Sequence, residues 1–234
     1  MTALIIVLAA AALLAFLWIS MGLTTVRFPG RVKRGRRVAC AGDSITYGCN
    51  IPFVYFFSYP RKLGRLLGKG YCVCSFGVND RDAQSTGDKP YIREKAYRDS
   101  IAFAPETVVL MLGSNDVKQN NWVSDEHFVT EYKALIQTYT ALPSVKKLIL
   151  MAPPAAFAPI AKVFYFTNDV PADKLFHLGE LVKKIGAELD LPVIDLYPLT
   201  ESRRDLLGPD GLHPSPKGAR LIAEKVKKAI EEGT

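Results

Sequence analysis

Five apolar runs that alternate with helical segments are the feature that most limits the possible folds of this chain. Such runs are typical of buried strands, and the stretches between them show helical periodicity. Strands that alternate with helices pair in parallel through right-handed crossovers, and the helices cover both faces of the sheet. We therefore predict an α/β fold with three layers, α/β/α, around a five-stranded parallel sheet of flavodoxin-like order, 2-1-3-4-5. The predicted strands are Arg37–Gly42, Tyr71–Val78, Thr107–Gly113, Lys146–Ala152 and Pro192–Leu196, and the predicted helices cover about 54–68, 92–102, 125–140, 172–190 and 215–231.

The amino-terminal part of the chain differs from the rest because the run from Ala3 to Leu23 contains no charged side chain. Its 21 residues span about 31 Å as a helix, which matches the hydrocarbon core of a bilayer. We predict a transmembrane anchor over residues 1–24, a basic juxtamembrane linker over 25–36 and one globular domain over 37–234. The alternative is a cleaved signal peptide, but no Lys or Arg precedes the apolar run.

The net charge of +7 is concentrated in one short segment. Six basic residues lie between positions 27 and 37, and without them the net charge is only +1, so no nucleic-acid partner is expected. Positive residues follow the apolar run and none precedes it, which predicts a single-pass membrane protein with its domain in the cytoplasm. An extracellular or secreted domain is the alternative. The four cysteines lack the spacing of a zinc site or a disulfide framework, and no metal is predicted.

The first predicted strand ends on Gly42-Asp43-Ser44, which places a serine where open α/β sheets present residues to ligands. A serine hydroxyl becomes a good nucleophile only when an imidazole takes its proton and a carboxylate orients that imidazole. Of the three histidines, His127 and His177 fall in helical patterns, where surface roles explain them. His213 lies in a loop rich in Gly and Pro, three residues after Asp210, so we predict Ser44, His213 and Asp210 as nucleophile, base and orienting acid. Asp210 alone could also be a turn former.

Two further strand ends supply candidate donors for an oxyanion. Gly77 ends the second strand, and Asn115 follows the third, where its amide can donate. The backbone N–H of Ser44 is the third candidate. The alternatives are that Gly77 only permits a turn and that Asn115 caps a helix.

Together these motifs resemble those of the SGNH hydrolases, the superfamily of GDSL-type esterases and lipases. Its four signature residues match Ser44, Gly77, Asn115 and His213, and its D-x-x-H matches Asp210 to His213. The resemblance extends from about residue 37 to the end of the chain, and it implies a serine esterase without a metal or organic cofactor. The chain lacks the G-x-S-x-G motif of the ordinary α/β-hydrolases, because no glycine stands two positions after Ser44.

Three stretches, "STGDKPYI", "AFAPETVVLMLGSNDVKQNNW" and "LPVIDLY", resemble sialate O-acetylesterases and other carbohydrate deacetylases. This implies a small acyl ester, an O-acetyl group on carbohydrate, as the substrate. The second block of the family often reads G-V-S-G-x-T, whereas residues 77–82 read G-V-N-D-R-D. Candidate substrate contacts in the loops after the second and third strands are Lys89, Tyr91 and Trp122. The alternatives are a membrane-tethered lysophospholipase or thioesterase and an inactive glycan-binding module.

Overall fold

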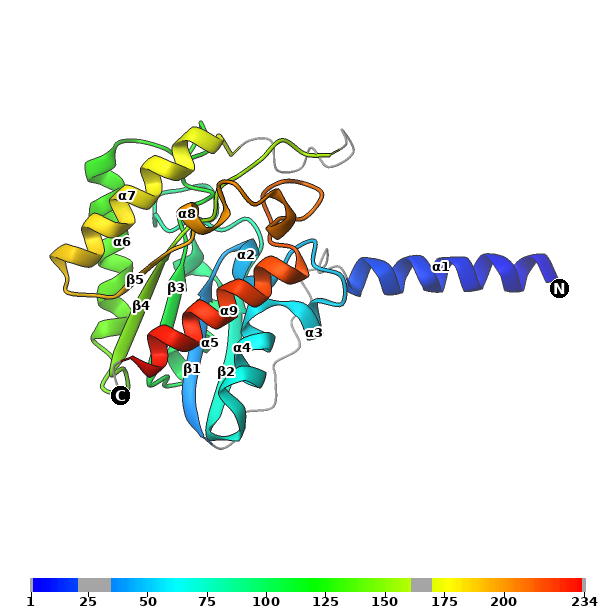
Figure 1. Ribbon diagram of the computed structural model, residues 1–234, viewed down its shortest axis with the longest axis horizontal. Helices are drawn as coiled ribbons and strands as arrows, with labels where there is room; N and C mark the ends of the chain where they lie inside the picture. Colours follow the sequence, from blue (N-terminus) through cyan, green and yellow to red (C-terminus); the bar gives the residue numbers. More distant parts are fainter. Residues whose placement is uncertain (1, 21–34, 161–169, 233–234) are drawn as a thin grey trace.

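The computed structural model describes residues 2–20, 35–160 and 170–232. Its centre is a sheet of five parallel strands in the order β2-β1-β3-β4-β5, which confirms the predicted order (Figure 1). The strands are β1 (Arg36–Gly42), β2 (Tyr71–Gly77), β3 (Thr107–Met111), β4 (Lys147–Ala152) and β5 (Val193–Asp195). The fifth strand is shorter than predicted.

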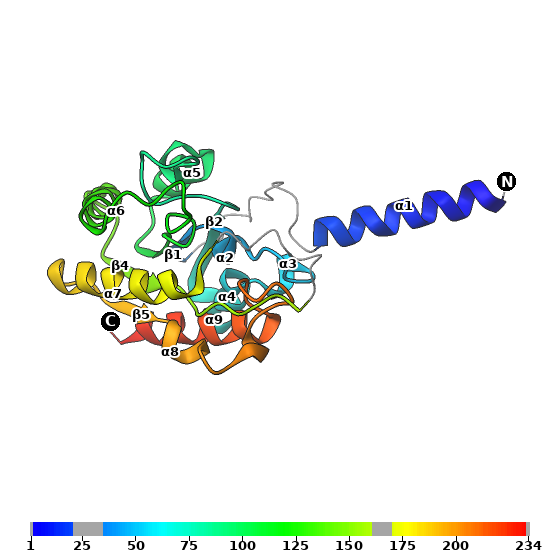
Figure 2. The same cartoon turned by 90° about the horizontal axis from the view of Figure 1, so that it is seen from above.

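Two helical layers cover the sheet, as the alternating pattern predicts. Figure 2 shows α5 and α6 on one side of the sheet and α4 and α9 on the other, and α7 packs beside α6. Their bounds are α4 (Tyr59–Leu67), α5 (Lys95–Ala102), α6 (Asp125–Thr140), α7 (Ala172–Glu188) and α9 (Pro216–Glu231). Alternate residues of β3 enter opposite cores: Val108 and Leu110 pack toward α5, α6 and α7, and Val109 and Met111 toward α4 and α9. Truncating such a Leu or Met to Ala costs about 2–5 kcal/mol of stability.

The predicted helix over residues 54–68 is broken in the structure. Two helices replace it, α3 (Val54–Phe57) and α4, and Ser58 between them is extended, with φ −61° and ψ 152°. Pro60 lies in the first turn of α4 and has no N–H, so the helical hydrogen bonds cannot continue through it. Other short segments are α2 (Ser44–Tyr47), α8 (Tyr197–Thr200) and 3₁₀ turns at Gly68–Gly70, Tyr91–Arg93 and Arg204–Leu206.

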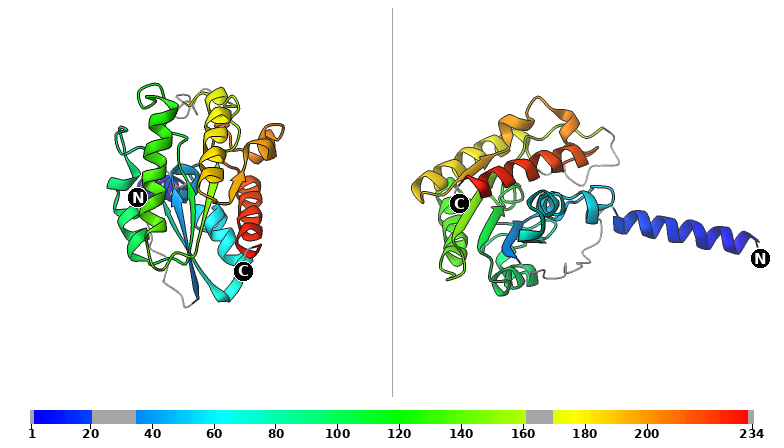
Figure 3. Two further views of the ribbon diagram at one scale, coloured as in Figure 1. Left: turned by 90° about the vertical axis from the view of Figure 1, so that its left-hand side faces the viewer. Right: turned by 60° about the horizontal axis from the view of Figure 1, so that its bottom comes forward.

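The amino-terminal helix α1 (Thr2–Ser20) extends away from the α/β body (Figures 1 and 3). The Phe16 ring contacts the Phe53 ring edge-on, with 5.9 Å between centroids. Over residues 2–20, 35–160 and 170–232, no helix is long and apolar enough to cross a membrane. The predicted anchor over residues 1–24 and the single-pass localisation are therefore not supported.

Two sequence predictions concern residues that the structure leaves out. Residues 21–24, at the end of the predicted anchor, lie outside the described residues. The predicted basic linker, residues 25–36, does so as well except for Gly35 and Arg36.

The carboxyl ends of β1, β2 and β3 meet at one edge of the sheet. Strand β1 lies between β2 and β3, and the strand order changes direction at this point. Open α/β sheets form their ligand sites at such a crossover. The loops that follow these three strands are therefore the place to look for a functional site.

Candidate active site

Ser44 lies two positions after the end of β1, as the first residue of the short helix α2. Asp43 caps this helix by accepting a hydrogen bond from the N–H of Ile45 at 2.9 Å. The Asp43 side chain is completely buried, and burial raises its pKa to about 6 although the Ile45 N–H opposes that shift. Asp43 therefore shapes the turn, and the Ser44 hydroxyl remains at the edge of the sheet.

His213 and Asp210 lie on the loop that precedes α9. His213 Nε2 is 2.7 Å from Ser44 Oγ, and His213 Nδ1 is 2.7 Å from Asp210 Oδ2. Both side chains of the pair are almost fully buried. The structure thus brings the three predicted residues into one hydrogen-bonded chain, with the geometry that a nucleophile, a base and an orienting acid require.

The Asp210 carboxylate is held by its own loop as well as by His213. Its Oδ1 accepts the backbone N–H groups of Leu212 and His213, each at 3.0 Å. Burial raises the pKa of Asp210, but the hydrogen bond and charge of His213, together with the Leu212 N–H, outweigh it and lower the pKa to about 2. The carboxylate is therefore ionised at neutral pH and can orient the imidazole.

Gly77 and Asn115 reach the same edge of the sheet from either side of β1. Gly77 pairs with Gly42 in the β1–β2 register, and a Cβ atom at Gly77 would lie only 2.2 Å from the backbone nitrogen of Tyr47. Only glycine fits at this close approach. Asn115 is 7% exposed, and its amide donates one hydrogen bond to the Arg81 carbonyl at 3.0 Å. Within the described residues this is the one hydrogen bond of the amide nitrogen, and its second hydrogen can serve a ligand.

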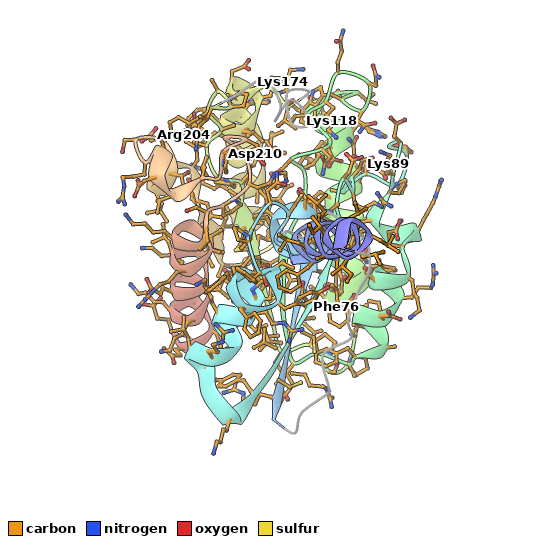
Figure 4. All side chains as sticks on the ribbon, turned by 90° about the vertical axis from the view of Figure 1, so that its right-hand side faces the viewer. Phe76, Lys89, Lys118, Lys174, Arg204 and Asp210 are labelled. Atoms are coloured by element: carbon orange, nitrogen blue, oxygen red, sulfur yellow. The ribbon has the colours of Figure 1, made fainter. Side chains whose placement is uncertain are left out.

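The three candidate substrate contacts occupy different environments. The Lys89 ammonium is exposed and pairs with Asp80, which also pairs with Lys118; in Figure 4 both lysines lie to the right of Asp210, on the side opposite Arg204. Tyr91 is completely buried, and its hydroxyl donates to the Phe76 carbonyl at 2.8 Å.

Trp122 stacks on Phe128, with 5.5 Å between ring centroids. Of the three candidates, Lys89 alone has an exposed side chain, whereas Trp122 and Tyr91 pack in or against the core.

The other two histidines form local pairs on the helices α6 and α7. His127 Nε2 is 2.9 Å from Thr86 Oγ1, and His177 Nε2 is 2.8 Å from Asp125 Oδ2. Both histidines have the surface helix positions that their sequence patterns predict.

A buried polar network joins the loops after β2 and β3, and the sequence did not predict it. Asp116 accepts the N–H groups of Ala83 at 2.8 Å and Gln84 at 2.9 Å, and burial raises its pKa to about 7. Asn121 donates to Asp82 Oδ1 at 3.0 Å and to the Asn115 carbonyl at 3.2 Å. This network fixes the loop that carries Asn115. Asp116 and Asn121 lie in a stretch that resembles carbohydrate deacetylases, but a single sequence does not show which side chains meet.

A second unpredicted contact involves Asn50, in the loop after α2. Its side-chain amide donates to Asp210 Oδ2. Asn50 lies six positions after Ser44 but carries no motif of its own, which is why the sequence did not single it out.

The model of the GDSL-like lipase/acylhydrolase family matches residues 40–221, which include Ser44, Gly77, Asn115, Asp210 and His213. The chain belongs to this family. The resemblance to GDSL-type esterases is thereby confirmed, and the family match begins at the strand that precedes Ser44 and ends in α9.

Among relatives of this GDSL-like chain is an acetylxylan esterase of Xylanibacter ruminicola, 34% identical over 212 residues. The match covers 83% of this chain and 43% of that relative, so the chain spans less than half the relative's length.

Two solved structures have the same fold as this GDSL-like chain. The native aryl esterase of M. smegmatis has a TM-score of 0.68 at 18% identity, covering 85% of this chain and 99% of that one. A carbohydrate acetylesterase family member from Sinorhizobium meliloti has a TM-score of 0.66 at 19% identity, covering 84% and 98%.

Proposed function

We propose that this chain is a serine esterase that removes small acyl groups, chiefly O-acetyl groups, from carbohydrate. The observation that carries the proposal is the continuous hydrogen-bonded chain from Ser44 Oγ through His213 to Asp210, with both distances 2.7 Å. Family membership supports ester hydrolysis as the reaction, and the acetylxylan esterase relative supports an acetylated glycan as the substrate.

The reaction begins when Ser44 Oγ attacks the ester carbonyl carbon. His213 Nε2 accepts the hydroxyl proton, and the ionised Asp210 stabilises the imidazolium and keeps the ring oriented. His213 then donates this proton to the leaving alcohol oxygen as the carbon–oxygen bond breaks. Water attacks the acyl-enzyme by the same proton transfers in the second half of the reaction, which releases the acid and restores Ser44.

The negative charge that develops on the carbonyl oxygen needs fixed donors. We assign this role to the N–H groups of Ser44 and Gly77 and to the side-chain amide of Asn115. A preorganised donor stabilises the tetrahedral intermediate more than the ground state, so it raises kcat. The bond from Asn115 to the Arg81 carbonyl supports this assignment because it holds the amide in place before substrate binds.

The experiment that tests the proposal measures acetate release from acetylated xylan and hydrolysis of nitrophenyl esters of increasing chain length. We expect the acetyl ester to give the highest kcat/KM, and Ser44→Ala to be inactive on every substrate. A higher kcat/KM on long-chain esters than on acetyl esters would contradict the proposed substrate class. Wild-type turnover by Ser44→Ala would contradict the serine mechanism.

A further inference from the structure

Asn50 has a backbone conformation that few residues other than glycine adopt. Its φ is 60°, in the left-handed region, where Asn is tolerated better than most side chains but still carries strain. A strained backbone conformation is kept only where surrounding contacts hold it, and such residues are frequent at functional sites. At Asn50 the contact that results is a hydrogen bond from Nδ2 to Asp210 Oδ2, across 160 positions of the sequence.

This amide completes the set of donors around the Asp210 carboxylate. Oδ1 accepts two backbone N–H groups from its own loop, and Oδ2 accepts His213 Nδ1 and Asn50 Nδ2. The two backbone N–H groups hold Oδ1 in place. The position of Oδ2 depends on the side chains of His213 and Asn50. Asn50 thus anchors the one oxygen that orients the imidazole, and it does so from the loop that follows Ser44.

We infer that Asn50 is a positioning residue, which holds Asp210 Oδ2 in line with His213 Nδ1 and thereby keeps Nε2 directed at Ser44. The inference rests on the proposed function, because it concerns the efficiency of the same proton transfer. The chain that follows Ser44 therefore also supports the orienting acid. The contact between Asn50 and Asp210 fixes the loop after α2 relative to the loop before α9.

The test compares Asn50→Gly with Asp190→Gly. Glycine keeps the positive φ at position 50 and removes the amide together with its methylene group. Asp190 is a matched control because it has a φ of 52°, is exposed and lies just after α7, remote from Asp210. The readouts are kcat and KM on nitrophenyl acetate, the rate at which a fluorophosphonate labels Ser44, and the melting temperature.

We expect Asn50→Gly to lower kcat and the labelling rate by about 10- to 100-fold, the size that a hydrogen bond to a charged group supplies. KM should change little, and Asp190→Gly should match the wild type. A wild-type labelling rate in Asn50→Gly would overturn the inference while leaving the serine mechanism intact. Absence of labelling in the wild type would instead overturn the proposed function.

A second variant, Asn50→Asp, separates hydrogen bonding from packing. The new carboxylate has almost the same shape but cannot donate when ionised, and its charge repels Asp210. Within the part of the chain that the structure describes, the other ionisable groups around Asp210 are His213, Cys49 and Asp43. Cys49 stays neutral because burial raises its pKa to about 12, and Asp43 is present in both proteins, so its titration affects both activities. The Arg204 guanidinium donates hydrogen bonds to the carbonyls of Gly208 and Pro209, in the loop that carries Asp210.

We expect the activity of Asn50→Asp relative to the wild type to rise as pH falls, because a protonated carboxyl can again donate to Asp210. A ratio that stays constant from pH 8 to pH 5 would contradict a hydrogen-bonding role for Asn50.

Discussion

The imidazole Nε2 of His213 lies 2.7 Å from the hydroxyl oxygen of Ser44, although 169 positions of sequence separate the two residues. Strand β1 delivers Ser44 to the edge of the sheet, and the loop before α9 delivers His213. The contact therefore depends on the packing of α9 against α4, which fixes that loop relative to the sheet. It is also the contact through which the proposed reaction would move its proton.

Removal of either end of this contact is expected to abolish hydrolysis. Ser44→Ala and His213→Ala should each lose activity while remaining folded, because both remove part of one proton-transfer unit. The double variant should be little worse than either single variant. Steady-state kinetics on nitrophenyl acetate, with circular dichroism as the control for folding, will check this. Most of the wild-type turnover in either single variant would mean that the nucleophile or the base has been misassigned.

Asn115→Ala is expected to lower kcat by about 10²–10³, the usual cost of losing one donor to a developing oxyanion. The effect on KM should be smaller, because the donor acts mainly in the transition state. Kinetics and thermal unfolding should be measured on the same preparation. Loss of stability with an unchanged kcat would identify Asn115 as a loop-fixing residue only.

Gly77→Ala is expected to destabilise the domain and remove activity, since its Cβ would meet backbone atoms of Thr46 and Tyr47 at 2.2–2.8 Å. Gly179→Ala is the matched control. This glycine lies within α7, and the nearest atom to an added Cβ is 3.8 Å away. Alanine there should be neutral or stabilising by up to about 1 kcal/mol. Urea unfolding gives the free energy of unfolding of both variants. Equal values for the two would contradict the steric argument at Gly77.

The stability of the fold is expected to decrease as pH rises from about 4 to about 7. Burial raises the pKa of Asp116 to about 7 and of Asp43 to about 6, above the value of about 3.9 in an unfolded chain. The native state therefore binds these two protons more tightly than the unfolded state does. The stabilisation that they give is fully present below about pH 4 and is lost as the pH rises through the folded-state pKa values of about 6 and about 7. Each pKa unit corresponds to about 1.4 kcal/mol.

Asp116→Asn isolates the larger of these two contributions. We expect the melting temperature of this variant to vary less between pH 5 and pH 8 than that of the wild type. Asp190→Asn, at an exposed position, serves as the control and should keep the wild-type slope. An unchanged slope in Asp116→Asn would show that Asp116 is not protonated in this range.

The fold was predictable because its signals are repeated along the chain. Five apolar strands with helices between them leave few alternatives, and the order β2-β1-β3-β4-β5 agrees with the prediction. The proximity of Ser44 and His213 was predictable for a different reason: Ser44 stands at a strand end and His213 in a loop rich in Gly and Pro. The break at Ser58 was also visible in principle, since Pro60 marks it.

Contacts between distant loops were not predictable from one sequence. Asn50 and Asp116 act through side chains and backbone groups that come together only in the folded chain. Tyr91 is predicted as a substrate contact from its loop position, and its complete burial depends on packing that the sequence does not show.

The position of β1 between β2 and β3 has a consequence for how the proposed ester hydrolysis can be inherited and redesigned. Neighbouring strands lie about 4.8 Å apart, a spacing that main-chain hydrogen bonds determine whatever the side chains are. The proposed donor at Gly77 is a backbone N–H at the end of β2, so its separation from Ser44 is a property of the backbone, and Asn115 follows β3 on a loop that the buried network holds. His213 and Asp210 lie instead on the loop before α9, which is separate from these strands. A descendant that lost them would keep the proposed donors for a carbonyl oxygen, and those donors would be a starting scaffold for an artificial acyl-transfer catalyst.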